Sequence, residues 1–104
     1  MAIMRVFWTD TARNQLEDIF NYYSEKVNLN TAKKLIGKII DRTIQLENNP
    51  LSGTKEPLLQ QRKFEYRYLV EGHYKIIYWI DGNYIKVASI FDCRQNPVKM
   101  KKVK

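Results

Sequence analysis

The chain has 104 residues, a formal net charge of +7, 44% hydrophobic residues and 28% charged residues. This length allows one domain over residues 1–104 with one core, and the composition excludes an intrinsically disordered chain. No apolar run approaches the roughly 20 residues of a membrane span, so we expect no membrane contact. The first ten residues lack a signal-peptide pattern, and the single cysteine excludes an intramolecular disulfide, so we expect a cytoplasmic protein.

The positive charge is concentrated toward the C-terminal end of the chain. Residues 9–27 have a balance of −2, whereas residues 92–104 have a balance of +4. A basic protein attracts nucleic acid, the ribosome or an acidic protein partner. The last residues, 98–104, carry four of the lysines and fit equally well a frayed basic tail that keeps the chain in solution.

The N-terminal half predicts a strand and two helices. The apolar run Arg5–Trp8 predicts a strand at the edge of a sheet, and Thr9 can cap the helix that follows by accepting a free backbone N–H. Apolar residues then recur at spacings of three and four, which indicates one buried helical face. That face contains Ala12, Leu16, Ile19, Phe20, Tyr23 and Val27.

A second amphipathic helix is expected after a short turn, with Asn30 or Thr31 as its cap. Its apolar face contains Ala32, Leu35, Ile36, Ile39, Ile40, Thr43 and Leu46. Asn48-Asn49-Pro50 ends it, because the residue before a proline disfavours helix. Two amphipathic helices with a short link form an antiparallel hairpin, and both apolar faces must pack on a sheet to be buried.

The C-terminal half predicts that sheet. Residues 51–65 contain Gly53 and Pro57 without a clear period, so we expect a loop with one helical turn at Leu58–Gln61. Three runs rich in β-branched and aromatic residues then predict strands, at Tyr66–Val70, Tyr74–Ile80 and Tyr84–Phe91. Glu71-Gly72-His73 and Asp81-Gly82-Asn83 are the turns between them. The predicted fold is α+β in two layers: an N-terminal strand, then an antiparallel helical hairpin packed on an antiparallel meander.

Few residues suggest metal or cofactor chemistry, and we expect neither. His73 and Cys93 are the only histidine and cysteine, and they are twenty residues apart, without the paired spacing of metal ligands. No glycine-rich phosphate loop is present. The candidates for contacts with a target or nucleic acid are instead cations along the meander, namely Arg62, Lys63, Arg67, Lys75 and Arg94. We expect Lys75 to be the sheet neighbour of Arg94, and Arg67 fits a structural ion pair equally well.

The order of elements and several short motifs resemble the RelE/ParE superfamily of toxins from type II toxin–antitoxin modules. The second helix ends at Asn49-Pro50 before Gly53, and Tyr66-Arg67 is followed by Tyr74-Lys75-Ile76-Ile77-Tyr78. The ending Phe91 to Pro97 is similar to a ParE-like branch. The resemblance implies one of two activities: RelE-type members cleave messenger RNA on the ribosome, whereas ParE-type members lack the nuclease residues and poison DNA gyrase.

The resemblance to the nuclease branch is incomplete. Glu56-Pro57-Leu58 matches that branch's loop motif, and Arg67 matches its arginine on the first meander strand. Leu59 stands where a lysine is expected, and Gln95-Asn96-Pro97 stands where a His-Tyr pair is expected. Neither proline nor asparagine can transfer a proton as those side chains do. The resemblance therefore favours a ParE-like toxin that acts by binding.

Toxins of this superfamily are neutralised by a cognate antitoxin, usually acidic in its C-terminal half, which suggests a hetero-oligomer. The aromatic residues Trp8, Phe20, Tyr23 and Trp79 are candidate antitoxin anchors, although most could belong to the core. One alternative is a ribosome-dependent endonuclease that uses Glu56, Lys63, Arg67 and Arg94. The other alternative is a non-toxic remnant that only binds its antitoxin.

Overall fold

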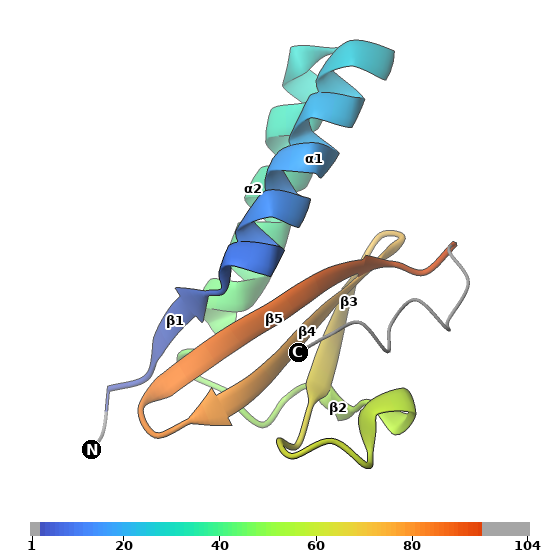
Figure 1. Ribbon diagram of the computed structural model, residues 1–104. Helices are drawn as coiled ribbons and strands as arrows, with labels where there is room; N and C mark the ends of the chain where they lie inside the picture. The colour runs from blue at the N-terminus through green and yellow to red at the C-terminus, as the bar shows by residue number, and fades with distance from the viewer. Residues whose placement is uncertain (1–2, 95–104) are drawn as a thin grey trace.

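The computed structural model describes residues 3–94 and contains two helices, five strands and one short 3-10 helix within that range (Figure 1). The order is β1 (Arg5–Trp8), α1 (Asp10–Lys26), α2 (Leu29–Gln45), β2 (Thr54–Lys55), η1 (Pro57–Leu59), β3 (Arg67–Glu71), β4 (Tyr74–Asp81) and β5 (Tyr84–Asp92). The basic tail expected at 98–104 lies outside the described residues. Neither helix in the described range is long and apolar enough to cross a bilayer.

The sheet is mixed, in the order β1-β5-β4-β3-β2. The predicted meander is confirmed, because β3, β4 and β5 pair antiparallel with their neighbours in sequence. The tight turn between β4 and β5 uses Gly82 at a φ of 58°, which a side chain would strain. The N-terminal strand is at the sheet edge as predicted, but β1 runs parallel to β5, since α1 and α2 carry the chain away and back before the meander begins.

The segment between α2 and the meander is more ordered than the sequence suggested. The loop expected over residues 51–65 contains β2, which pairs antiparallel with β3 through Thr54 and Lys55. The expected helical turn at Leu58–Gln61 is instead η1, which begins at Pro57. A strand of two residues is too short to show an alternating apolar pattern in the sequence. It forms because it pairs with β3, a dozen residues later in the chain.

Each helix is capped at its N-terminus by a side chain that accepts a hydrogen bond from a free backbone N–H. Thr9 caps α1 as predicted, with its hydroxyl accepting from the N–H of Ala12 at 3.2 Å. The second cap was predicted wrongly: α2 is capped by Asn28, whose Oδ1 accepts from the N–H of Thr31 at 2.7 Å, and the helix already includes Asn30. Val27 was expected on the buried face of α1, but it follows the helix as its C-cap and is 56% exposed.

The sheet has a core on each face. On one face, buried Ala12 of α1 and Ile39 of α2 pack against Ile76 and Val87 of the strands. On the other face, the segment around η1 covers the sheet with a smaller cluster: Leu59, Tyr66, Ile77, Ala88 and Phe91. Figure 1 shows the helical pair lying against the strands at its base, while the turn between α1 and α2 projects beyond them.

The loop that follows α2 is joined to the sheet by Tyr78 of β4, whose side chain belongs to the helix-side core. Its ring is fully buried, and its hydroxyl donates to the carbonyl of Pro50 at 2.8 Å and accepts from the N–H of Gly53 at 2.9 Å. A Cβ on residue 53 would lie 2.4 Å from the Tyr78 Oη and 2.9 Å from the carbonyl oxygen of Tyr68. Only glycine therefore allows the loop to approach the strand this closely.

We predict that Gly53→Ala lowers the free energy of unfolding by about 3 kcal/mol, because overpacking adds to the loss of a buried hydrogen bond. The matched control is Gly37→Ala within α2, where an added Cβ meets nothing within 4 Å. That variant should gain about 0.5–1 kcal/mol, since alanine favours helix over glycine. Urea denaturation followed by circular dichroism measures both, and equal midpoints for the two variants would contradict the prediction.

Candidate binding surfaces

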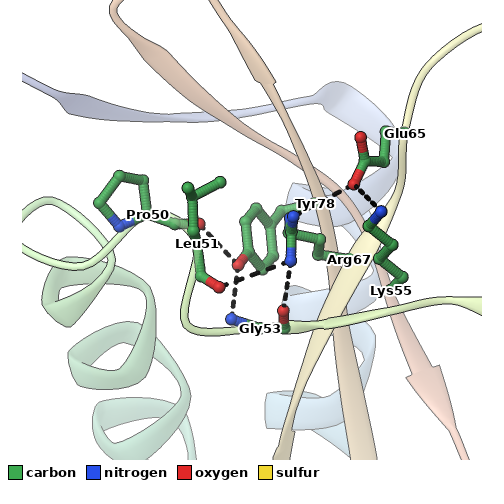
Figure 2. Close-up of polar contacts among 7 residues, drawn as sticks. All are labelled: Pro50, Leu51, Gly53, Lys55, Glu65, Arg67 and Tyr78. Carbon is green, nitrogen blue, oxygen red and sulfur yellow. Dashed lines mark hydrogen bonds and ion pairs between the residues drawn. The ribbon is translucent and has the colours of Figure 1, made fainter.

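Arg67 is the first residue of β3, and its guanidinium is used to hold the preceding loop. Nη1 donates to the carbonyl of Gly53 at 2.9 Å, and Nη2 pairs with Glu65 Oε1 at 3.1 Å (Figure 2). Lys55 of β2 pairs with the same carboxylate at 3.4 Å. The Arg67 side chain is only 18% exposed. The sequence allowed either a structural ion pair or a substrate contact for Arg67. In the fold, Arg67 forms the structural ion pair.

Arg67 also lies close to the Tyr78 ring. The two residues are paired across β3 and β4 and face the same side of the sheet. Burial raises the pKa of the Tyr78 hydroxyl, and the hydrogen bond from Gly53 and the charge of Arg67 partly oppose that rise. Tyr78 is therefore a neutral anchor at physiological pH, not a source of a proton or an anion.

Glu56 and Lys75 form an ion pair beneath η1. The Glu56 side chain is fully buried; its Oε2 accepts from Lys75 Nζ at 3.0 Å, and its Oε1 accepts from the N–H of Leu58 at 3.1 Å. The Lys75 ammonium also lies 4.2 Å from the centroid of the Tyr68 ring. Because Tyr68 alternates with Arg67 along β3, this pair lies on the face opposite Arg67. Both carboxylate oxygens of Glu56 are therefore engaged within the fold.

Arg94 is held at the end of β5 by Asp92. Its Nε and Nη2 donate to the two carboxylate oxygens at 3.0 and 2.8 Å, a bidentate arrangement. The hydrogen bond from Arg94 lowers the pKa of the Asp92 carboxyl, and Asp92 raises the pKa of the guanidinium. Tyr74 pairs with Asp92 across β4 and β5. The pKa of the Tyr74 hydroxyl is raised mainly by burial and further by its hydrogen bond with Tyr23. Lys75 pairs with Phe91 near the end of β5, so it is the closer sheet neighbour of Arg94 as expected, but its side chain lies on the opposite face of the sheet from the Asp92–Arg94 pair.

The remaining basic residues surround a hollow beside η1. It has a volume of about 490 Å³, and its lining includes Lys55, Arg62, Lys63 and Phe64. The Lys63 ammonium lies 5.6 Å from the centroid of the Phe64 ring. Tyr66 also lines the hollow. Burial raises the pKa of its hydroxyl, and the charge of Arg62 opposes that rise. The structure thus divides the candidate cations among four places and does not gather Glu56, Lys63, Arg67 and Arg94 around one phosphate-sized site.

The four aromatic residues proposed as antitoxin anchors are also separated. Trp8 and Tyr23 pack at the edge of the helix-side core, and Phe20 is half-buried on α1. Trp79 lies on the opposite face of the sheet, stacked on Phe64 with centroids 5.2 Å apart. Its indole Nε1 is buried and has no hydrogen-bond partner within residues 3–94, which is rare for a buried donor.

Several exposed apolar side chains were not singled out from the sequence. On α2, Leu29 is 52% exposed and Ile44 is 50% exposed. Ile36 and Ile40 are half-buried and lie between them at helical spacing. The sequence signal was present, because α2 carries more apolar residues than one buried stripe needs. Phe7, Phe64 and Tyr84 are exposed on the sheet side, but short alternating strands do not reveal which face has a covering layer.

His73 and Cys93 are both exposed, at the β3–β4 turn and just after β5. The Cys93 N–H donates to the His73 carbonyl at 2.7 Å, so their backbones are adjacent. Across residues 3–94, no three histidine, cysteine or acidic side chains group as metal ligands would. This corner of the structure is a turn closed by backbone pairing.

The comparisons with known proteins agree with this geometry. A family model described as the ParE toxin of type II toxin–antitoxin systems, parDE, matches residues 6–97. The fold is similar to a chromosomal ParDE system from P. aeruginosa, with a TM-score of 0.74 and 19% identity over 88% of this chain and 98% of that chain. A RelBE toxin–antitoxin complex from Mycobacterium tuberculosis matches with a TM-score of 0.62 and 17% identity, over 86% of this chain and 98% of that chain. A YoeB dimer from Staphylococcus aureus matches with a TM-score of 0.53 and 23% identity, over 86% of this chain and 95% of that chain. No curated protein sequence matches.

We predict an asymmetry in the Glu56–Lys75 pair. Lys75→Met leaves a fully buried carboxylate without its cation and should cost about 3–5 kcal/mol of stability. Glu56→Gln keeps an acceptor for the Leu58 N–H and leaves a lysine that is 23% exposed and can reach water, so its cost should be below about 2 kcal/mol. Guanidinium denaturation measures both. A larger loss in Glu56→Gln would contradict the structural role assigned to the pair.

Proposed function

This chain belongs to the ParE toxin family of type II toxin–antitoxin systems, and we propose that it inhibits growth by binding its target, DNA gyrase, without cleaving a substrate. The observation that supports the proposal is the use of the candidate nuclease groups as structural ties. Glu56 is buried against Lys75, Arg67 holds Gly53 and Glu65, and Arg94 is engaged by Asp92. A nuclease needs such groups free to meet a phosphate and to transfer a proton.

The surface chemistry supports a protein target and a protein inhibitor. A net charge of +7 attracts an acidic antitoxin segment and speeds its association. The apolar stripe of α2, formed by Leu29, Ile36, Ile40 and Ile44, offers about 22 Å of helix surface at a rise of 1.5 Å per residue. Lys33 lies within this stripe, so an amphipathic acidic helix would find both apolar contacts and a cation.

The toxin activity is tested with purified protein and gyrase. We predict that the protein inhibits ATP-dependent supercoiling of a relaxed plasmid at micromolar concentration, and that the cognate antitoxin relieves the inhibition. Leu29→Asp with Ile44→Gln should weaken antitoxin binding by at least about tenfold, about 1.4 kcal/mol, through lost apolar contact. Both side chains are half exposed, so the fold should tolerate the changes.

The matched control is Val70→Thr, which alters an equally exposed apolar residue on β3. It should leave antitoxin binding within about twofold of the parent, as measured by isothermal titration. Supercoiling that is untouched by a micromolar excess of folded protein would contradict gyrase as the target. Unchanged antitoxin affinity in the α2 variant would contradict the helix stripe as the docking surface.

A further inference from the structure

A row of aromatic and cationic side chains crosses the sheet face that the helices do not cover. Phe7 of β1 pairs with Lys86 of β5, and Lys86 pairs with Trp79 of β4, so the three side chains face the same side. Phe64 extends the row from the loop, since it stacks on Trp79 with an interplanar angle of 19°. Because Trp79 packs with the smaller core cluster, this side is opposite the helices.

Cations alternate with the rings along this row. The Lys86 ammonium lies 4.8 Å from the Phe7 ring centroid and 5.8 Å from that of Tyr84. At the other end, the Lys63 ammonium lies 5.6 Å from the Phe64 ring, at the rim of the basic hollow. The nearby carboxylates are already occupied: Asp81 pairs with Lys86, and Glu65 pairs with Lys55 and Arg67.

The rings in this row remain open to solvent. Phe7 and Tyr84 are each 48% exposed, and Phe64 is 39% exposed. Exposed aromatic rings interleaved with cations suit a ligand with flat faces and negative charge. Bases stack on such rings with little dependence on sequence, while lysines near the rings meet the phosphates. An open sheet has no projecting helix for a duplex groove, so unpaired bases fit this face better than a double helix.

We propose that the row Phe7–Lys86–Trp79–Phe64 is a binding platform for single-stranded nucleic acid. Bases stack on Phe7 and Phe64, and the backbone phosphates meet Lys86, Lys63 and the cations of the basic hollow. The buried indole N–H of Trp79 lies within this row and has no hydrogen-bond partner within residues 3–94. The platform is distinct from the α2 stripe and does not depend on gyrase as the target.

The experiment uses the full chain with Trp8→Phe, which leaves Trp79 as the sole tryptophan. Fluorescein-labelled 12-residue oligothymidylate and oligouridylate are titrated in 50 mM salt, and anisotropy and Trp79 fluorescence are recorded together. We expect saturable binding, quenching of Trp79 by base stacking, and weaker binding of a 12-base-pair duplex. A preference between the two oligonucleotides distinguishes the DNA strand from the RNA strand, and either preference supports the platform.

Two variants separate stacking from simple charge attraction. Phe7→Leu with Phe64→Leu keeps apolar bulk but removes both rings, and it should weaken binding by at least about fivefold without changing the salt dependence of affinity. The control Tyr22→Leu removes a ring that is 56% exposed on α1 and should leave affinity unchanged. No binding up to 100 µM oligonucleotide (roughly, the upper range of weak non-specific affinity) overturns the proposal. Equal affinity of the ring variant and the parent also overturns it, and neither result bears on gyrase inhibition.

Discussion

The hydroxyl of Tyr78 determines how the second half of the chain is arranged. It is buried in the sheet, and it connects β4 to both Pro50 and Gly53 of the segment that leaves α2. A buried hydroxyl that made neither bond would cost about 1–3 kcal/mol, so the loop is held where both partners can reach it. Arg67 strengthens the same junction through the Gly53 carbonyl. The course of β2 and η1 across the sheet follows from this attachment.

The attachment also decides what the basic residues can do. Once the loop lies over the sheet, Glu56 is enclosed and must take Lys75 as its partner, and Glu65 lies between Arg67 and Lys55. Three cations are thereby used to neutralise carboxylates within the fold. Other cations keep exposed positions, among them Lys33, Lys34 and Lys38 on α2 and Lys63 beside the basic hollow. The basic residues on the sheet thus serve the fold, while exposed cations elsewhere are placed for contact.

Local patterns predicted much of the fold. Strand composition located β1 and the meander, and the Thr9 hydroxyl marked the start of α1, because these signals depend on neighbouring residues. The loop was not predictable in the same way, since the partners of Gly53 and Glu56 are 25 and 19 residues away. Asn28 and Asn30 are both good caps, and sequence alone does not say which N–H groups are free. The sequence also did not show which face of the sheet has exposed aromatic rings, because that depends on where the loop attaches.

The claim that this ParE family member acts by contact is tested most directly by the integrity of messenger RNA during translation. Purified protein is added to a translating ribosome extract, and primer extension detects cleavage in the ribosomal A site. We expect full-length messages at concentrations that inhibit gyrase supercoiling, because Glu56, Arg67 and Arg94 are engaged within the fold. Cleavage at the A site that disappears in a folded Arg67→Ala variant would contradict the claim.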